Sequence, residues 1–75
     1  MNVKERLADK YFYQFCKEMD YTEDYVDCLE VTRKSNSHIY KCYNKITNEF
    51  MDINVFINIT HIIVSDEYKT IVFEN

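Results

Sequence analysis

Carboxylates crowd one short segment in the first half of the chain. Residues 18–30 contain six acidic side chains and neither lysine nor arginine. The acidic residues are Glu18, Asp20, Glu23, Asp24, Asp27 and Glu30. Six like charges this close together repel one another unless a cationic partner compensates them. The segment is therefore suited to electrostatic recognition of a basic surface, with carboxylates in the place of nucleic-acid phosphates.

Two tyrosines within the segment strengthen this hypothesis, because a tyrosine ring gives a large contact area at a low cost in conformational entropy. The residues that we expect to contact the partner are Tyr21, Glu23, Asp24, Tyr25 and Asp27. The alternative is a solvated loop beside a solvated hairpin, in which facing pairs such as Glu30 and Lys41 contribute little energy.

The segment that follows carries the opposite charge, since residues 31–48 contain no Asp or Glu. Basic residues interleaved with aromatic rings form the usual platform for single-stranded nucleic acid. The residues of this alternative nucleic-acid face are Arg33, Lys34, Lys41, Tyr43 and Lys45. Phe50 and Phe56 would extend the face if they lie on the surface, whereas Glu30 and Asp52 would weaken its positive field.

Metal-binding and catalytic patterns are weak. The soft ligands after residue 20 are Cys28, His38, Cys42 and His61, and they lack the paired C-x-x-C spacing of zinc sites. On one strand, His38 and Cys42 would stand about 13 Å apart, too far for a nucleophile and its base. The chain has no glycine, so a glycine-rich phosphate loop is excluded. We therefore expect no metal, no cofactor and no enzymatic activity.

Composition indicates the kind of gene rather than the function. Phe, Tyr, Met, Ile, Asn and Lys, which AT-rich codons encode, make up 37 of the 75 residues, and Gly, Ala, Arg and Pro only three. Such a skew is common in phages, viruses, mobile elements and low-GC bacteria. The net charge of -4 disfavours nonspecific nucleic-acid binding.

Two further observations favour the cytoplasm. Three cysteines are an odd number at spacings that suit free thiols, and charged residues interrupt the first apolar residues where a signal peptide would have its core. The most apolar stretch, residues 53–64, contains four polar residues, so we expect no membrane span.

A helix is predicted over residues 2–19, because apolar side chains recur there on one face. The members of this stripe are Val3, Leu7, Ala8, Tyr11, Phe12, Phe15, Cys16 and Met19. Asn2 precedes the first turn and is a suitable N-cap. Tyr13 lies off the stripe, so we expect its ring to be exposed. An acidic loop over residues 20–27 follows.

From residue 28 to residue 74 the apolar period changes to two, which predicts antiparallel strands with one buried face. A two-residue loop at Ser35–Asn36 would pair Val31 with Tyr40 and Leu29 with Cys42, apolar against apolar. Because the chain has no glycine, Asn36 in this loop and Asn48 in the next one are the residues expected to adopt a positive φ.

The next hairpin follows the same logic. A two-residue loop at Thr47–Asn48 would pair Cys42 with Ile53 and Tyr40 with Val55. Beyond it the alternation loses phase, which indicates a bend near residues 58–61 and two more strands, over residues 61–65 and 69–73.

These elements predict a single α+β domain over residues 1–75, with one N-terminal helix packed on an antiparallel sheet of about five short strands. A helix followed by five short antiparallel strands resembles the element order of small SH3-like barrels, the Sm type included. Closure into such a barrel is one alternative and an open sheet is the other. The choice decides whether Phe50 and Phe56 belong to the core or to the surface.

The leading functional hypothesis is a small acidic, non-enzymatic protein-binding module. It would be a phage, viral or mobile-element inhibitor of the anti-CRISPR or DNA-mimic kind, which blocks a basic groove on a host nucleic-acid-processing or defence protein in the host cytoplasm. One alternative is a small barrel that binds RNA or single-stranded DNA. Another is a homodimeric interaction protein that buries its surplus tyrosines against a second copy.

Overall fold

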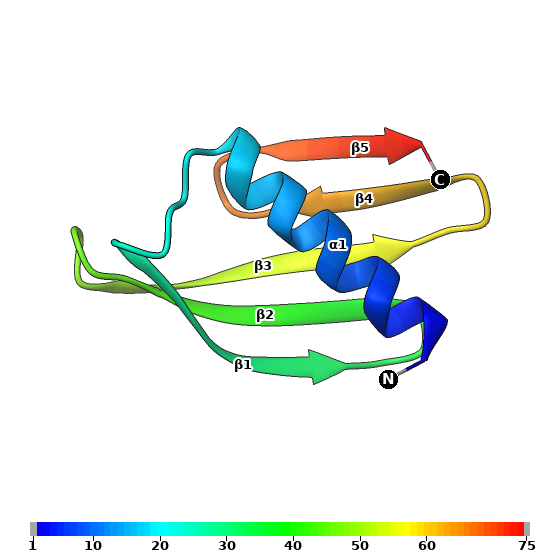
Figure 1. The fold of residues 1–75 in the computed structure, drawn as a ribbon, viewed down its shortest axis with the longest axis horizontal. Coiled ribbons are helices and arrows are strands. Elements are labelled where there is room, and N and C mark those ends of the chain that lie inside the picture. The colour runs from blue at the N-terminus through cyan, green and yellow to red at the C-terminus, as the bar shows by residue number, and fades with distance from the viewer. Residues whose placement is uncertain (1, 75) are drawn as a thin grey trace.

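One helix lies across one face of a five-stranded antiparallel sheet in the computed structural model, which describes residues 2–74 (Figure 1). The elements are α1 (Val3–Glu18), β1 (Val26–Arg33), β2 (Ser37–Asn44), β3 (Glu49–Ile57), β4 (His61–Ser65) and β5 (Thr70–Glu74). The strands follow one another in the sheet in chain order, each antiparallel to the next. The predicted α+β class is confirmed.

The sheet is open, so the open-sheet alternative is confirmed and the alternative of closure into an SH3-like barrel is wrong. β1 and β5 are the two outer strands of the order β1–β2–β3–β4–β5, and neither pairs with the other. Figure 1 shows them at opposite edges of the sheet. A meander of this kind buries its apolar face under one helix, and therefore it needs no closure to form a core.

The helix begins and packs as the sequence predicts. The side chain of Asn2 accepts a hydrogen bond from the Glu5 backbone amide at 2.8 Å, which satisfies one of the free N–H groups of the first turn. The buried residues of α1 are Ala8, Tyr11, Phe12 and Phe15. The core of the sheet beneath it is formed by Tyr40, Cys42, Met51, Ile53, Val55, Ile57, Ile62 and Val64.

The first hairpin keeps most of its predicted register. Val31 pairs with Tyr40 across a two-residue loop, as expected. A β-bulge between Cys28 and Glu30 shifts the rest, so Cys28 rather than Leu29 lies opposite Cys42. Leu29 is the extra residue and its side chain is 56% exposed, which corrects the predicted pairing. β1 also begins at Val26, two residues earlier than expected, and the loop that precedes it covers residues 19–25 instead of 20–27.

The second hairpin differs from the predicted register by two residues. Cys42 pairs with Met51 instead of Ile53, and Tyr40 pairs with Ile53 instead of Val55. The loop has four residues, because the Asn44 side chain accepts the backbone amides of the two residues after Lys45. A shift of two residues leaves every side chain on the same face, and therefore the predicted inner face survives the error.

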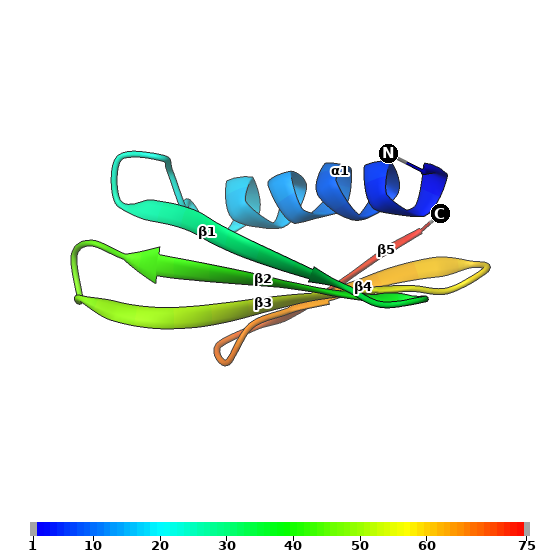
Figure 2. The same ribbon diagram turned by 90° about the horizontal axis from the view of Figure 1, so that it is seen from below.

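The opposite face of the sheet is bare. Figure 2 shows α1 on one side of the sheet, and no element within residues 2–74 covers the other side. Phe50 is 63% exposed there and Phe56 44%, so both belong to the surface and not to the core. The strand predicted over residues 61–65 is confirmed as β4, and β5 begins one residue later than predicted.

Candidate functional site

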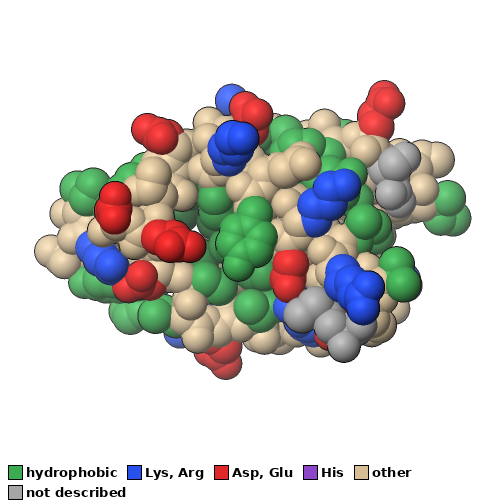
Figure 3. Space-filling view, viewed as in Figure 1, with side chains coloured by type: hydrophobic (Ala, Val, Ile, Leu, Met, Phe, Trp, Pro, Cys, Tyr) green, Lys and Arg blue, Asp and Glu red, His purple; other side chains and the backbone are tan. Residues whose placement is uncertain are grey.

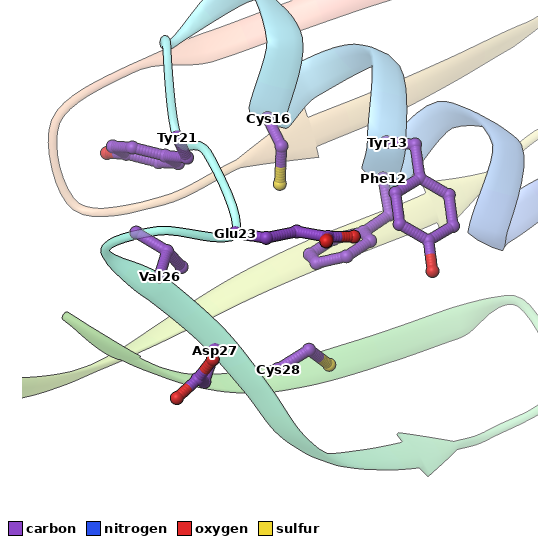
Figure 4. A pocket seen from close by; sticks show the side chains of 8 residues that line it. All are labelled: Phe12, Tyr13, Cys16, Tyr21, Glu23, Val26, Asp27 and Cys28. Carbon is purple, nitrogen blue, oxygen red and sulfur yellow. The ribbon is translucent and has the colours of Figure 1, made fainter. Parts of the chain in front are cut away.

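A cleft of about 420 Å³ lies where the C-terminal half of α1, the α1–β1 loop and the start of β1 meet (Figure 4). Its lining residues are Phe12, Tyr13, Cys16, Tyr21, Glu23, Val26, Asp27 and Cys28. Two tyrosines, a phenylalanine and two acidic residues are therefore among the residues that line one hollow. We refer to it below as the acidic cleft.

The end of α1 forms one wall of the cleft. Asp20 has a φ of 60°, a left-handed conformation in which aspartate is tolerated better than most residues other than glycine. The Tyr21 amide donates to the Cys16 carbonyl at 2.8 Å and the Asp20 amide to the Lys17 carbonyl at 3.2 Å. This pair of bonds is a Schellman motif, which reverses the chain and directs Tyr21 back towards the helix.

Tyr21 is fixed at both ends. Its hydroxyl donates to an Asp66 carboxylate oxygen at 2.6 Å, and its ring meets the rings of Phe15 and Tyr25 edge-on. Burial, and then the hydrogen bond to Asp66, raises the pKa of the Tyr21 hydroxyl. Tyr21 is thus a neutral wall of the cleft, held in place by its hydroxyl and by its ring.

The bottom of the acidic cleft is apolar. Phe12 and Val26 are buried, and the Phe12 ring stacks on Tyr40 with 4.1 Å between centroids. Burial raises the pKa of the Cys16 thiol to about 12, so this thiol is protonated at neutral pH and behaves as a small apolar group. Cys16 is therefore part of the apolar floor of the cleft.

Charge is concentrated on the rim. In Figure 4 the Glu23 side chain extends from the loop towards Phe12 and Tyr13, whereas the Asp27 carboxylate points away from the hollow. Asp27 pairs with Lys45 at 3.3 Å between carboxylate oxygen and Nζ. Within residues 2–74, no lysine, arginine or histidine forms an ion pair with Glu23 or Asp24.

The face that carries α1 is acidic around the cleft. Acidic side chains gather at the left of Figure 3, where the helix leads into β1, with a basic side chain among them. Aromatic walls and an uncompensated carboxylate rim favour a long cationic side chain, because its stem packs on the rings while its charge meets the carboxylate.

The five residues predicted to contact a partner take different places. Tyr21, Glu23 and Asp27 line the acidic cleft, and Asp24 is exposed beside it. Tyr25 is half-buried against the core. Its backbone carbonyl accepts a hydrogen bond from the Lys45 amide at 2.7 Å, which joins the α1–β1 loop to the β2–β3 loop.

Sequence reasoning missed the wall of the cleft that α1 supplies. Phe12, Tyr13 and Cys16 lie on the helix, and only the exclusion of Tyr13 from the apolar stripe signalled that a ring would be left on the surface. Val26 and Cys28, on β1, were not anticipated either.

The alternative basic set is not gathered into one patch. Arg33 binds Asp9 at 3.0 Å and lies 3.9 Å from Glu5, under the helix. Lys45 pairs with Asp27, and Lys34 is exposed beyond the end of β1.

Only part of that set shares the outer face. There, Lys41 lies 5.3 Å from the centre of the Phe50 ring, which also meets Tyr43 edge-on. Lys41 has Glu30 on one neighbouring strand and Asp52 on the other.

Other site types find little support in residues 2–74. No three His, Cys, Asp or Glu side chains in this range are arranged to hold a metal ion. In the same range, no helix is both long and apolar enough to cross a membrane.

Comparison with protein-family models, with curated proteins and with solved structures gives no match to this chain.

Proposed function

We propose that this chain is a protein-binding module whose acidic cleft receives a lysine or arginine side chain from the basic surface of a partner protein. The observation that carries the proposal is the position of the Glu23 carboxylate, which extends towards the rings of Phe12 and Tyr13 without an intramolecular cation among residues 2–74. A guanidinium or ammonium group from outside would supply the missing charge.

The target of this module would be a protein that itself binds nucleic acid. Such proteins have basic grooves, and a chain of net charge -4 with its free carboxylates at one end is steered towards them. Docking there would block the groove sterically and electrostatically. A phage or mobile-element inhibitor of a host nuclease would act in this way.

The proposal is tested with defined probes rather than an unknown partner. Fluorescence anisotropy is measured for labelled octa-arginine and octalysine against the full chain and against the double variant Glu23→Gln/Asp24→Asn. We expect roughly tenfold weaker binding by the variant, the effect of about 1.4 kcal/mol.

A charge-matched control is the double variant Glu49→Gln/Glu74→Gln, which removes two negative charges from exposed sites that do not line the acidic cleft. It should bind the cationic peptides within about twofold of the unchanged protein, because long-range attraction alone is weak in physiological salt. Equal losses in both double variants would mean that only net charge matters, and the cleft would have no role.

The nucleic-acid hypothesis stays as the second candidate, because Lys41, Tyr43 and Phe50 share the bare outer face of the sheet. A labelled single-stranded RNA is therefore included in the same titration. RNA binding that weakens in Lys41→Ala and falls steeply with salt would favour this second candidate over the first.

A further inference from the structure

The bare face of the sheet has a regular pattern of side chains. Strand pairing places the residues of this face in rows that cross the strands, and the rows differ in how many charged residues they contain. One row reads Ser37, Phe56, Ile63 and Val72 from β2 to β5. The adjacent row reads Thr32, Ile39, Asn54, Ser65 and Thr70 from β1 to β5.

These two rows form an uncharged surface, which we call the neutral face. None of their nine residues is charged, although 29% of the whole chain is. Phe56 and Val72 are 44% and 59% exposed, and Ile39 and Ile63 are partly exposed beside them. Neighbouring rows on one face are about 7–8 Å apart along the diagonal, so these four side chains form a continuous apolar patch. Patches of this kind mark interaction sites.

Charge decides what can cover the neutral face. The chain is acidic overall, with a net charge of -4, so two copies repel one another over most of their surfaces. They meet the least repulsion where both surfaces carry no charge. The next row along the same face reads Glu30, Lys41 and Asp52, and a row that holds both signs can complement its own copy across a twofold axis.

We propose that the neutral face is the interface of a homodimer, in which two copies pack sheet against sheet with their helices outward. Two such sheets stack about 10 Å apart and interdigitate their side chains, as in β-sandwiches. Five strands spaced by about 4.8 Å and of comparable length give a face of about 20 by 20 Å, or about 400 Å². This is about half of the ~800 Å² that each partner contributes to an interface of standard size, so we expect a weak dimer.

The dimer is independent of the acidic cleft. The cleft is lined by α1 on the covered side of the sheet, whereas the neutral face lies on the other side. Two copies joined in this way present two acidic clefts on opposite sides of the assembly. Failure of one proposal therefore leaves the other standing.

The test is sedimentation velocity of the full chain from about 1 µM to about 1 mM, a range that covers weak and moderate dimers. We expect a shift towards twice the chain mass of 9.2 kDa as the concentration rises. Phe56→Glu places a charge at the centre of the neutral face and should weaken association at least about thirtyfold, the scale of an interface hot spot. Val72→Glu should act in the same direction.

Ile46→Glu is the matched control, because Ile46 is an exposed aliphatic residue that lies in the β2–β3 loop and outside the neutral face. It should dimerise like the unchanged chain. Circular dichroism of each variant as a monomer checks that the fold is kept, and Phe56 and Val72 are exposed enough to accept glutamate. A chain that stays monomeric at about 1 mM, or equal effects of Phe56→Glu and Ile46→Glu, would overturn the proposal.

Discussion

Asp9 ties the helix to the first two strands through one carboxylate oxygen. That oxygen accepts the Tyr40 hydroxyl at 2.5 Å and the Arg33 guanidinium at 3.0 Å. Burial, and then the hydrogen bond to Asp9, raises the pKa of Tyr40, so its phenol remains a donor at any physiological pH. Arg33 is held by this network, and therefore the residue that the sequence assigned to a nucleic-acid face serves the packing of the fold.

His38 is the buried polar residue beside this network. Its ring is 2% exposed, Nε2 has no hydrogen-bond partner within residues 2–74, and Nδ1 lies 3.5 Å from Arg33. Burial lowers the pKa of His38 below its ordinary value of 6.5, and the charges of Arg33 and Lys4 act in the same direction. Glu5 and Asp9 oppose the shift without reversing it.

We predict that His38 destabilises the protein in mild acid. The unfolded chain binds a proton at this site near pH 6.5 and the folded chain only at lower pH, so stability falls as pH drops below about 6.5. The slope contributed by this one site approaches about 1.4 kcal/mol per pH unit between the two pKa values. Urea unfolding of the unchanged protein and of His38→Gln, from pH 7.5 to pH 5, measures the difference.

His61→Gln serves as the control, because His61 is only partly buried and its Nδ1 lies 2.9 Å from the Thr60 hydroxyl. It should keep the pH dependence of the unchanged protein. If the His38→Gln variant loses stability in parallel with the unchanged protein, protonation of His38 is not the cause.

At the scale of the elements, the fold makes its tight reversals without glycine. Within residues 2–74 only Asp20 and Asn48 have a positive φ, at 60° and 59°. Asp20 ends the helix and Asn48 closes the β2–β3 loop. Asn48 was predicted for this role, whereas Asn36 does not adopt a positive φ and that part of the prediction is wrong. The Ser35–Asn36 loop forms without a left-handed residue.

Replacement of Asn48 by alanine should therefore lower the free energy of unfolding by about 1 kcal/mol, because a Cβ that lacks a local polar group strains the left-handed region. Asn48→Gly should be less harmful, although it also loses the hydrogen bond that the Tyr43 hydroxyl donates at 2.9 Å. Chemical denaturation of both variants gives the comparison.

Asn36→Ala is the control, and it should lower the free energy of unfolding by less than about half of the effect of Asn48→Ala. Glycine and alanine with equal effects at position 48 would show that the backbone conformation is not the cause.

The alternation of side chains between the two faces of a strand explains which parts of the sheet the sequence could predict. The second hairpin was predicted two residues out of register, yet Tyr40, Cys42 and Ile53 all point into the core as expected. Alternation fixes which face a side chain takes, and any even shift preserves it. It does not fix loop length, which depends here on the Asn44 side chain, nor the bulge that turns Leu29 to the surface.

On the scale of the whole molecule, a helix on one side of an open sheet leaves half of the sheet surface to solvent. A second copy on the neutral face would complete the layers and couple stability to concentration. We therefore expect the melting temperature of the unchanged protein to rise by several degrees between about 10 µM and about 1 mM. Scanning calorimetry at a series of concentrations measures this shift.

Phe56→Glu supplies the comparison for that experiment. Its melting temperature should rise much less with concentration, since the variant associates at least about thirtyfold more weakly and gains correspondingly less stability. A concentration-dependent rise of the same size in Phe56→Glu would locate the coupling elsewhere on the molecule.

The sequence by itself determined the class of the fold, the helix with its Asn2 cap, the inner face of each strand and the segregation of acidic from basic residues. These properties follow from local periodicity and capping, which act over a few neighbouring residues. Only the tertiary structure decided that the sheet stays open, that α1 supplies one wall of the acidic cleft and that Arg33 is bound by Asp9. Each of those depends on contacts between residues far apart in the chain, and their geometry is set by packing that no local pattern encodes.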